Sequence, residues 1–126
     1  MLQGLRTVVY GVQDIATAKA WYREVLGIEP YFDQPFYVGF NVGGYELGLD
    51  PAAPAGTSAI SGPVVYWGVA KAEAAMQQIV ALGAQVIEPI RHVGDDIYLG
   101  TVCDPFGNVF GIIENPHFSL PSLGPA

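Results

Sequence analysis

Hydrophobic positions along the chain switch between the two-residue period of strands and the three-to-four-residue period of helices. Residues 6–12 are rich in Val and Tyr, which predicts a strand. From Ile15 onward the apolar residues fall three or four positions apart, which predicts an amphipathic helix packed on a sheet. Asp14 is a good N-cap for this helix, and Gly27 fits a left-handed stop at its end.

After this helix, short β-rich runs alternate with turn residues as far as Asp50. We expect a short strand near residues 29–32, a longer strand over 36–42 and its hairpin partner over 45–49. The Gly43-Gly44 pair predicts the tight turn of that hairpin. The first half of the chain therefore has the predicted order β-α-β-β-β.

The same order of elements recurs in the second half of the chain. Val8-Val9-Tyr10 returns as Val64-Val65-Tyr66, and Leu26-Gly27 returns as Leu82-Gly83 at the same spacing. The expected elements are a strand over 64–69, a helix over 70–82 that Gly83 ends, and strands over 85–88, 97–102 and 108–113, with a turn at Asp104-Pro-Phe-Gly-Asn108. Repetition of this kind predicts a duplicated module in an α+β fold.

The predicted elements divide the chain into four parts. They are a first βαβββ module over residues 1–51, a linker over 52–63 that is rich in Pro, Gly and small residues, a second βαβββ module over 64–115, and a tail over 116–126. We expect the two modules to form one domain and the Pro- and Ser-rich tail to be loosely held.

Composition narrows the classes of function. The chain has 126 residues, of which 51% are hydrophobic and 13% charged, and this excludes a disordered protein. A formal net charge of −7 argues against a nucleic-acid partner and against an anionic membrane surface. No apolar run reaches the roughly 18 residues of a membrane span, no secretory signal is visible, and the single Cys103 suits a reducing compartment. We expect a cytoplasmic protein.

Four segments together resemble one family. They are Val12-Gln13-Asp14, the helix end Trp21-Tyr22-Arg23-Glu24-Val25-Leu26-Gly27, Leu82-Gly83-Ala84, and Asp104-Pro-Phe-Gly-Asn108. This combination resembles the vicinal oxygen chelate superfamily, which includes glyoxalase I, extradiol dioxygenases and bleomycin-resistance proteins, over residues 4–115. Leu26-Gly-Ile-Glu-Pro-Tyr31 with Gly48-Leu-Asp-Pro51 looks like a bacterial glyoxalase-like subgroup of it.

The resemblance implies that the paired βαβββ modules form a cup-shaped, mixed or antiparallel sheet with the helices outside. It also implies a divalent metal ion in the cup, held by one residue from the first and the fourth strand of each module. In active relatives such a metal polarises oxygen atoms of the substrate.

This chain departs from the metal-binding pattern. The four family positions fall on Thr7, Gly48, Val64 and Gly111, and these residues are not a competent ligand set. Glu46 is the single exception, because it lies two residues from Gly48 on the same face of a strand. We therefore expect neither a metal nor another cofactor at this position.

Strand alternation predicts which residues face into the cup. The candidate ligand-binding residues are Thr7, Tyr37, Asn41, Glu46, Gly48, Asp50, Val64, Tyr66 and Gly111, together with His92, which we expect in a connection over residues 89–96 at the mouth of the cup.

Several of these candidates have a structural alternative. Gly48 and Gly111 make room either for a ligand or for neighbouring aromatic side chains. Glu46 and Asp50 either pair with a cationic ligand or transfer protons; alternatively, Asp50 caps a turn and Glu46 is solvated at the rim. His92 is either a general base or a loop histidine.

Three functions compete on this basis. The favoured one is metal-free binding of a small, partly apolar molecule in the cup, for sequestration or sensing, by a protein that forms a homodimer. The second is a metal-dependent lyase or dioxygenase with an atypical site that includes Glu46 and His92. The third is a metal-independent enzyme that uses Glu46, Asp50 or a tyrosine as acid or base.

Overall fold

The computed structural model describes residues 1–119, and within this range it has two helices and eight strands in two four-stranded sheets. The first module consists of β1 (Thr7–Gly11), α1 (Ile15–Leu26), β2 (Phe32–Gln34), β3 (Tyr37–Val42) and β4 (Tyr45–Asp50). The second consists of β5 (Tyr66–Gly68), α2 (Ala72–Ala81), β6 (Gln85–His92), β7 (Tyr98–Cys103) and β8 (Val109–Glu114). The predicted α+β fold of two βαβββ modules is confirmed.

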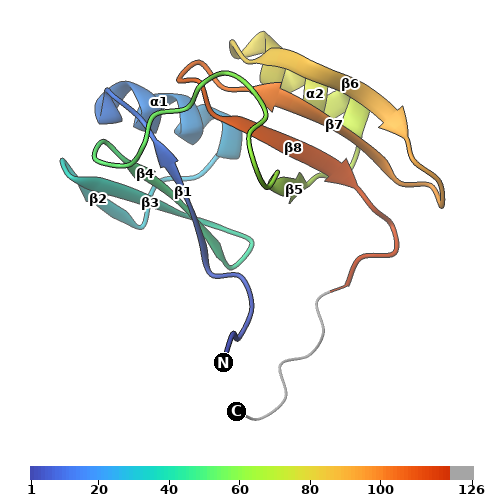
Figure 1. Ribbon diagram of the computed structural model, residues 1–126, viewed down its shortest axis with the longest axis horizontal. Helices are drawn as coiled ribbons and strands as arrows, with labels where there is room; N and C mark the ends of the chain where they lie inside the picture. Colours follow the sequence, from blue (N-terminus) through green and yellow to red (C-terminus); the bar gives the residue numbers. More distant parts are fainter. Residues whose placement is uncertain (120–126) are drawn as a thin grey trace.

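Both sheets are mixed and have the same topology. The strand orders are β1-β4-β3-β2 and β5-β8-β7-β6. In each sheet the first strand lies parallel to the fourth and the remaining pairs are antiparallel. β1 and β5 are therefore edge strands, and Figure 1 shows them on the inner borders of the two sheets.

Local sequence explains both ends of α1. The Asp14 carboxylate accepts a hydrogen bond from the Thr17 backbone N–H at 3.1 Å, and Gly27 adopts a left-handed conformation with φ of 68°. α2 has no such cap, because Lys71 at its N-cap makes no side-chain hydrogen bond to the helix. Instead the Glu114 carboxylate, on β8, accepts from the Ala72 backbone N–H at 2.8 Å. A distant side chain thus replaces the local N-cap, and its negative charge suits the helix N-terminus.

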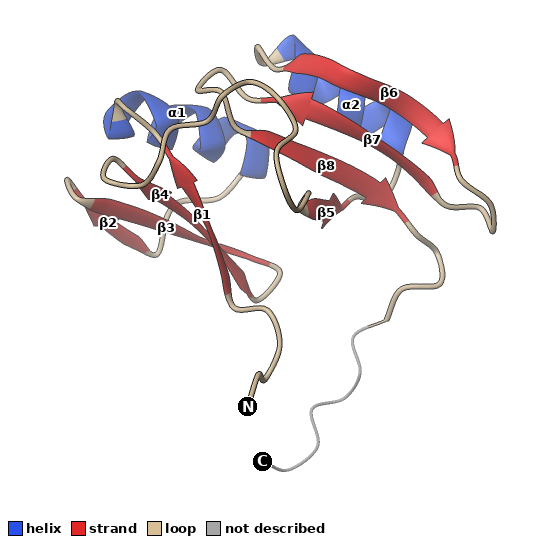
Figure 2. Cartoon of the chain, viewed as in Figure 1, coloured by secondary structure: helices blue, strands red, loops and turns tan. Residues whose placement is uncertain are grey.

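Each helix packs on one face of its own sheet (Figure 2). The strand residues on these faces form one core with the helices: Tyr10, Val38, Phe40, Leu47 and Leu49 with Ala18 and Tyr22, and Val102, Phe110 and Ile112 with Met76 and Ile79. Burial of each large apolar side chain contributes about 1.5–3 kcal/mol. The alternate strand positions face away from the helices, and we call these the helix-free faces of the two sheets.

The core continues from one module into the other. Tyr10 stacks on both Tyr22 and Phe110, with ring centroids 6.0 and 6.1 Å apart. Polar groups join the modules as well: the buried Tyr22 hydroxyl donates to the Asp104 carboxylate at 2.6 Å, and the partly buried Trp67 indole donates to the Tyr10 hydroxyl at 3.0 Å. These contacts fix the two sheets relative to each other.

The linker passes over this junction (green in Figure 1). Ala55 forms a β-bridge with Gly11, and the Ser58 backbone N–H donates to the Gly107 carbonyl at 2.9 Å. The linker is thereby attached to the start of β8 as well as to the end of β1.

Three predicted boundaries are wrong. The short strand expected near residues 29–32 lies later in the chain, as β2 (Phe32–Gln34). β5 starts at Tyr66 rather than at Val64, so Val64 lies outside the strand, next to Pro63, which has no N–H for a sheet ladder. β6 extends through Pro89 to His92, so His92 ends a strand and does not lie in a connection. Pro89 is tolerated because β6 is an edge strand with irregular pairing to β7.

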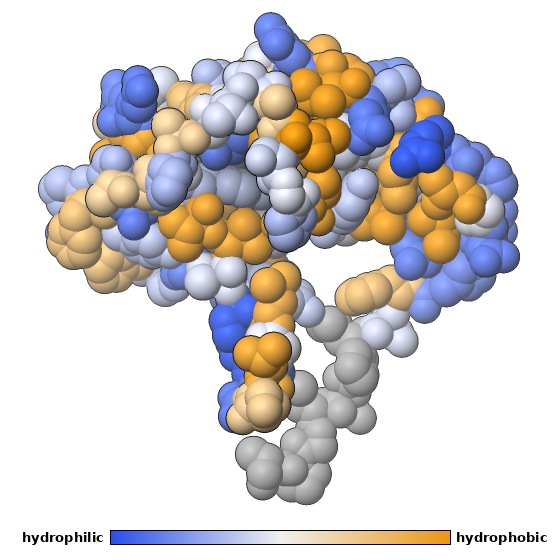
Figure 3. All heavy atoms as spheres, in the orientation of Figure 1, coloured by the Kyte–Doolittle hydropathy of each residue, from blue (hydrophilic) through white to orange (hydrophobic). Residues whose placement is uncertain are grey.

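Four further observations complete the description of the fold. Cys103 is buried, as expected for a small apolar residue. Hydrophobic residues form several surface patches between hydrophilic ones (Figure 3). No helix in residues 1–119 is long and apolar enough to cross a membrane. The tail prediction lies partly outside the described residues, and at residue 117 the histidine Nε2 lies 2.8 Å from the Asp95 carbonyl oxygen.

Candidate functional site

The helix-free face of the first sheet is built from cross-strand neighbours on four strands. Thr7 lies opposite Glu46, and Gly48 lies between Val9 and Gly39. Phe32 of β2 pairs with Gly39 and continues the same row. This face is open to solvent at several points, since Val9 and Phe32 are 43% and 39% exposed.

Glu46 is the centre of a hydrogen-bond cluster on this face. Its Oε1 accepts from the Thr7 hydroxyl at 2.5 Å and from the Tyr37 hydroxyl at 2.7 Å. Its Oε2 accepts from the Tyr31 hydroxyl. We call these four residues, Thr7, Tyr31, Tyr37 and Glu46, the Glu46 cluster.

The cluster keeps Glu46 ionised and both tyrosines neutral. Partial burial by itself raises the pKa of Glu46, but the hydrogen bonds from Thr7, Tyr31 and Tyr37 outweigh it and lower the pKa below its usual value. The hydrogen bond to Glu46 raises the pKa of Tyr31, whereas desolvation, followed by the hydrogen bond to Glu46, raises the pKa of Tyr37. At neutral pH the cluster is therefore one negative charge held by hydroxyl groups.

Two glycines make this arrangement possible. A Cβ atom at Gly48 would overlap with the Tyr37 hydroxyl, which lies across that position. A Cβ atom at Gly39 would lie 2.7 Å from Glu46 Oε2 and 3.2 Å from the Tyr31 ring. Side chains at either position would push a tyrosine away from Glu46. Of the two interpretations of Gly48, the one in which an aromatic side chain occupies the space fits this arrangement.

The helix-free face of the second sheet repeats the glycine, but its carboxylate, Glu88, lies on β6 and accepts from a single hydroxyl, that of Thr101 at 3.1 Å. Gly111 lies opposite Tyr66, and a Cβ atom at Gly111 would overlap with the Tyr66 ring. The flanking residues of β8 on the same face are Val109 and Ile113. Tyr66 is 38% exposed, so the part of this face around Gly111 presents an aromatic and aliphatic surface to solvent.

The residues at the implied metal positions do not fit a metal ion. Gly48 and Gly111 have no donor atoms and lie beneath tyrosine side chains, and Val64 is aliphatic. The Thr7 hydroxyl already donates its hydrogen bond to Glu46. Among residues 1–119 no group of three or more His, Cys, Asp or Glu side chains is placed to hold a metal. A single carboxylate with neutral hydroxyls is a poor donor set for a divalent ion.

The remaining predicted residues have local contacts of their own. Asn41 accepts from the Gly44 N–H at 2.8 Å in the β3–β4 turn, and Asp50 accepts from the Ala52 N–H at 2.8 Å in the turn after β4. The turn-capping alternative for Asp50 therefore fits the structure. The ring of His92 lies 4.9 Å from that of Tyr98.

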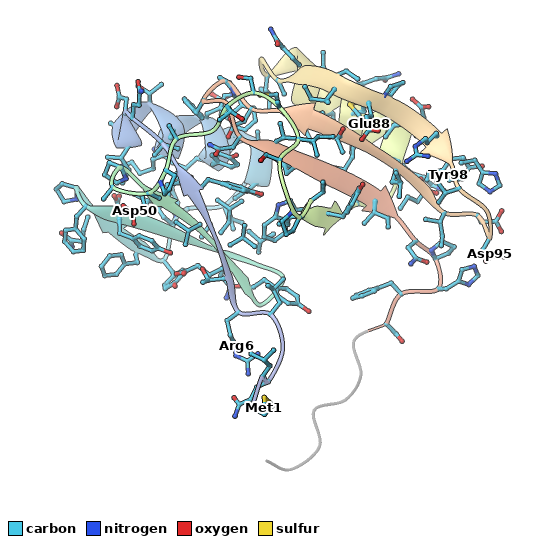
Figure 4. All side chains as sticks on the ribbon, viewed as in Figure 1. Met1, Arg6, Asp50, Glu88, Asp95 and Tyr98 are labelled. Carbon is cyan, nitrogen blue, oxygen red and sulfur yellow. The ribbon has the colours of Figure 1, made fainter. Side chains whose placement is uncertain are left out.

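His92 is not brought together with the Glu46 cluster. Its partner Tyr98 lies on the second sheet, far from Asp50 on the first sheet (Figure 4). An atypical site that combines Glu46 with His92 therefore has no support in this geometry.

Sequence reasoning missed Tyr31 and Phe32. Tyr31 precedes β2, where its backbone N–H donates to the Gly39 carbonyl at 3.0 Å. Phe32 packs near Tyr37, with ring centroids 6.2 Å apart. The sequence does contain a signal for such residues, the glycines Gly39 and Gly48, which pair across two adjacent strands. A pair of glycines leaves space above the sheet that large side chains nearby can fill.

A cavity of about 570 Å³ lies on the other side of the sheets, between α1 and α2. Its lining is mainly apolar and includes Val25, Trp67 and Leu82. It contains no cluster of polar groups comparable with that around Glu46, and we therefore place the candidate site on the helix-free face.

Comparison with known proteins agrees with this fold. The family model of the Glyoxalase/Bleomycin resistance protein/Dioxygenase superfamily matches residues 4–112. No curated protein shows a significant sequence match to the chain.

Solved structures of the same superfamily superimpose over most of their length. A glyoxalase-related enzyme from Fulvimarina pelagi is 23% identical, with 96% of this chain and 94% of that chain covered and a TM-score of 0.75. A family enzyme from Burkholderia phytofirmans PsJN is 22% identical, with coverages of 86% and 95% and a TM-score of 0.71. The fosfomycin resistance protein FosX from Listeria monocytogenes is 16% identical, with coverages of 93% and 97% and a TM-score of 0.72. At these identities the likeness concerns the fold alone, and with the family match it leads to one conclusion: the chain belongs to the glyoxalase/bleomycin resistance protein/dioxygenase superfamily.

Proposed function

We propose that this protein binds a small, partly apolar molecule on the helix-free face of its first sheet, without a metal ion, and serves to sequester or to sense that molecule. The observation that carries the proposal is the Glu46 cluster, a charged carboxylate held by three hydroxyl groups beside exposed apolar side chains. Ligand sites typically combine an apolar surface with a few convergent polar groups.

The electrostatics of the cluster favour binding over proton abstraction. A general base works best when its pKa lies near the working pH, whereas the hydroxyl groups lower the pKa of Glu46 below its usual value. The carboxylate of Asp50, the other candidate base, accepts a hydrogen bond from the Ala52 N–H in the turn after β4. Acid-base catalysis by these two residues therefore has less support than binding.

The proposal includes a homodimer. β1 and β5 are edge strands, and Val9 and Tyr66 on them are 43% and 38% exposed. Exposed edges with apolar side chains favour association with another chain, and a second copy would enlarge the apolar part of the site. Light scattering coupled to size exclusion is expected to give twice the mass of the chain, and a monomer at micromolar concentration would contradict this part.

A cytoplasmic setting is also part of the proposal. The single Cys103 is a buried free thiol, which suits a reducing compartment.

The binding proposal can be tested with N-phenyl-1-naphthylamine, an uncharged fluorescent probe, on protein treated with EDTA. We expect the probe to bind, and Val9→Asp to weaken binding at least about fivefold because it places a charge on the apolar part of the site. Val80→Asp is the matched control, because Val80 on α2 is similarly exposed at 40%. Equal loss in both variants, or binding only after a divalent metal is added, would contradict the proposal.

A further inference from the structure

We infer that the molecule bound on the helix-free face of the first sheet carries a positively charged nitrogen, an alkylammonium group, that lies against Glu46 and the aromatic rings beside it. The inference rests on the proposed function and specifies the class of ligand.

The first argument is charge. The described ion pairs are Lys19–Asp33, Arg23–Glu29 and Lys71–Glu114, so within residues 1–119 Glu46 has no cationic partner. Arg6, its neighbour across the strands, directs its guanidinium to the Gln3 and Leu5 carbonyls instead. The face thus presents an uncompensated negative charge to which a cationic ligand is complementary.

The second argument is the aromatic surface around that charge. Tyr31 is 63% exposed, Phe36 is 66% exposed and Phe32 is 39% exposed. Phe32 lies 6.0 Å from Phe36 and 6.2 Å from Tyr37 between ring centroids, so these three rings form one continuous group. Tyr31 donates its hydroxyl to the same carboxylate as Tyr37. Aromatic rings around a carboxylate are the environment that proteins use for quaternary ammonium groups, through cation–π attraction.

The third argument is the remaining capacity of the carboxylate. An ionised carboxylate offers roughly four acceptor positions, and the Glu46 cluster occupies three of them, two on Oε1 and one on Oε2. One position on Oε2 is left for an N–H donor of an amine, while a quaternary ammonium needs only the charge and the rings. A metal ion would need several more oxygen ligands than this face supplies.

The test compares choline with its uncharged isostere 3,3-dimethylbutan-1-ol in titrations followed by amide NMR shifts. We expect choline to bind about tenfold more tightly than the isostere, with shifts at residues 7–9, 31–39 and 46–48. Glu46→Gln, which keeps the shape of the side chain, is expected to abolish this preference. Glu88→Gln is the matched control, because Glu88 also accepts a threonine hydroxyl, that of Thr101 at 3.1 Å, but on the second sheet.

A second pair of variants tests the rings. Tyr31→Phe keeps the ring and is expected to weaken choline binding by about twofold, whereas Tyr31→Ala removes it and is expected to weaken binding by about tenfold. Equal effects of the two variants would overturn the cation–π part of the inference.

The outcomes separate the inference from the proposed function. If the isostere shifts the same amides and binds as well as choline, or if Glu46→Gln leaves the preference intact, the inference is wrong while the binding function stands. If neither molecule shifts these amides, and the naphthylamine probe is insensitive to Val9→Asp, both fail. Choline shifts confined to other surfaces would also overturn the inference.

Discussion

The two sheets share one topology and differ in what they present on their helix-free faces. In the ladders, Val9 lies opposite Gly48 in the first sheet and Tyr66 lies opposite Gly111 in the second. Two residues before these glycines, the first sheet has Glu46 and the second has Val109. The first face therefore carries a carboxylate held by three hydroxyl groups. On the second face Glu88 accepts from a single hydroxyl, that of Thr101, and the residues next to Gly111 on β5 and β8 are aromatic or aliphatic.

The comparison also separates the strand positions that form the core from those that lie on the helix-free faces. The helix-facing positions of both sheets are apolar and join in one core, so they determine the fold. The helix-free positions contribute little to that core and are where the two modules diverge. A duplicated fold can thus keep its architecture while the polar groups on its helix-free faces diverge, with three hydroxyl groups around Glu46 on the first sheet and one against Glu88 on the second.

Gly111→Val should have the largest effect on stability. The new side chain would meet the Tyr66 ring close to its base, where a small rotation does not relieve the overlap. We expect a loss of about 3 kcal/mol in the free energy of unfolding, measured by urea denaturation. The double variant with Tyr66→Ala should recover at least half of this loss, and no recovery would mean that Tyr66 does not cover Gly111.

Tyr22→Phe should weaken the junction that both modules share. It removes the 2.6 Å hydrogen bond to Asp104, whose carboxylate is buried, so we expect a loss of about 2 kcal/mol in urea denaturation. Tyr45→Phe on β4 is the control and should change stability by less than about 0.5 kcal/mol. If Tyr22→Phe weakened choline binding as much as Glu46→Gln does, the junction between the modules and the binding site would not be independent, which would contradict the account.

Gly48→Val should cost less stability than its counterpart on the second sheet, about 1 kcal/mol, because it meets only the hydroxyl end of Tyr37, which can swing away. The same swing breaks the hydrogen bond from Tyr37 to Glu46. We therefore expect Gly48→Val to weaken choline binding severalfold and Gly111→Val to leave it nearly unchanged. The reverse order in titrations would place the site on the second sheet.

The smallest effect expected is that of pH on choline binding. The titratable groups facing Glu46 are Tyr31, Tyr37 and Asp50, and none of them is cationic. Because the pKa of Glu46 is lowered, binding should be constant from pH 6 to 9 and should fall only as pH drops through the lowered pKa, below the usual 4.5. The hydrogen bonds to Glu46 stabilise the fold over the same range, and this contribution is lost at acid pH. A loss of binding near pH 6.5 would instead indicate a histidine.

Much of the fold could be predicted from the sequence because its signals are local. The apolar spacing after Ile15, the Asp14 cap and the Gly27 stop each specify their own element, and the structure has them where predicted. The sequence repeat predicted the duplication, but it aligns Tyr66 with Tyr10. In the two sheets Val9 pairs with Gly48 and Tyr66 pairs with Gly111, so Tyr66 is equivalent to Val9 and the predicted alignment is shifted by one residue. Short repeats of similar residues do not fix a register, whereas strand pairing does.

The candidate site was only partly predictable because it depends on contacts between distant segments. Alternation along the strands predicted that Thr7, Tyr37 and Glu46 face into the cup, and in the structure the two hydroxyl groups donate to the Glu46 carboxylate. Tyr31 was not predicted as a site residue because its hydroxyl reaches Glu46, on another strand, only through the space above Gly39. His92 was misplaced because Pro89 suggested the end of a strand, although an edge strand tolerates proline.

The most direct test of the account is the metal content of the purified protein, determined by elemental analysis on samples prepared without chelator. The residues on the two helix-free faces predict well under one Zn, Ni, Mn or Fe per chain, and full choline binding after exhaustive treatment with EDTA. One tightly held divalent ion per chain, removed together with the binding activity, would contradict it.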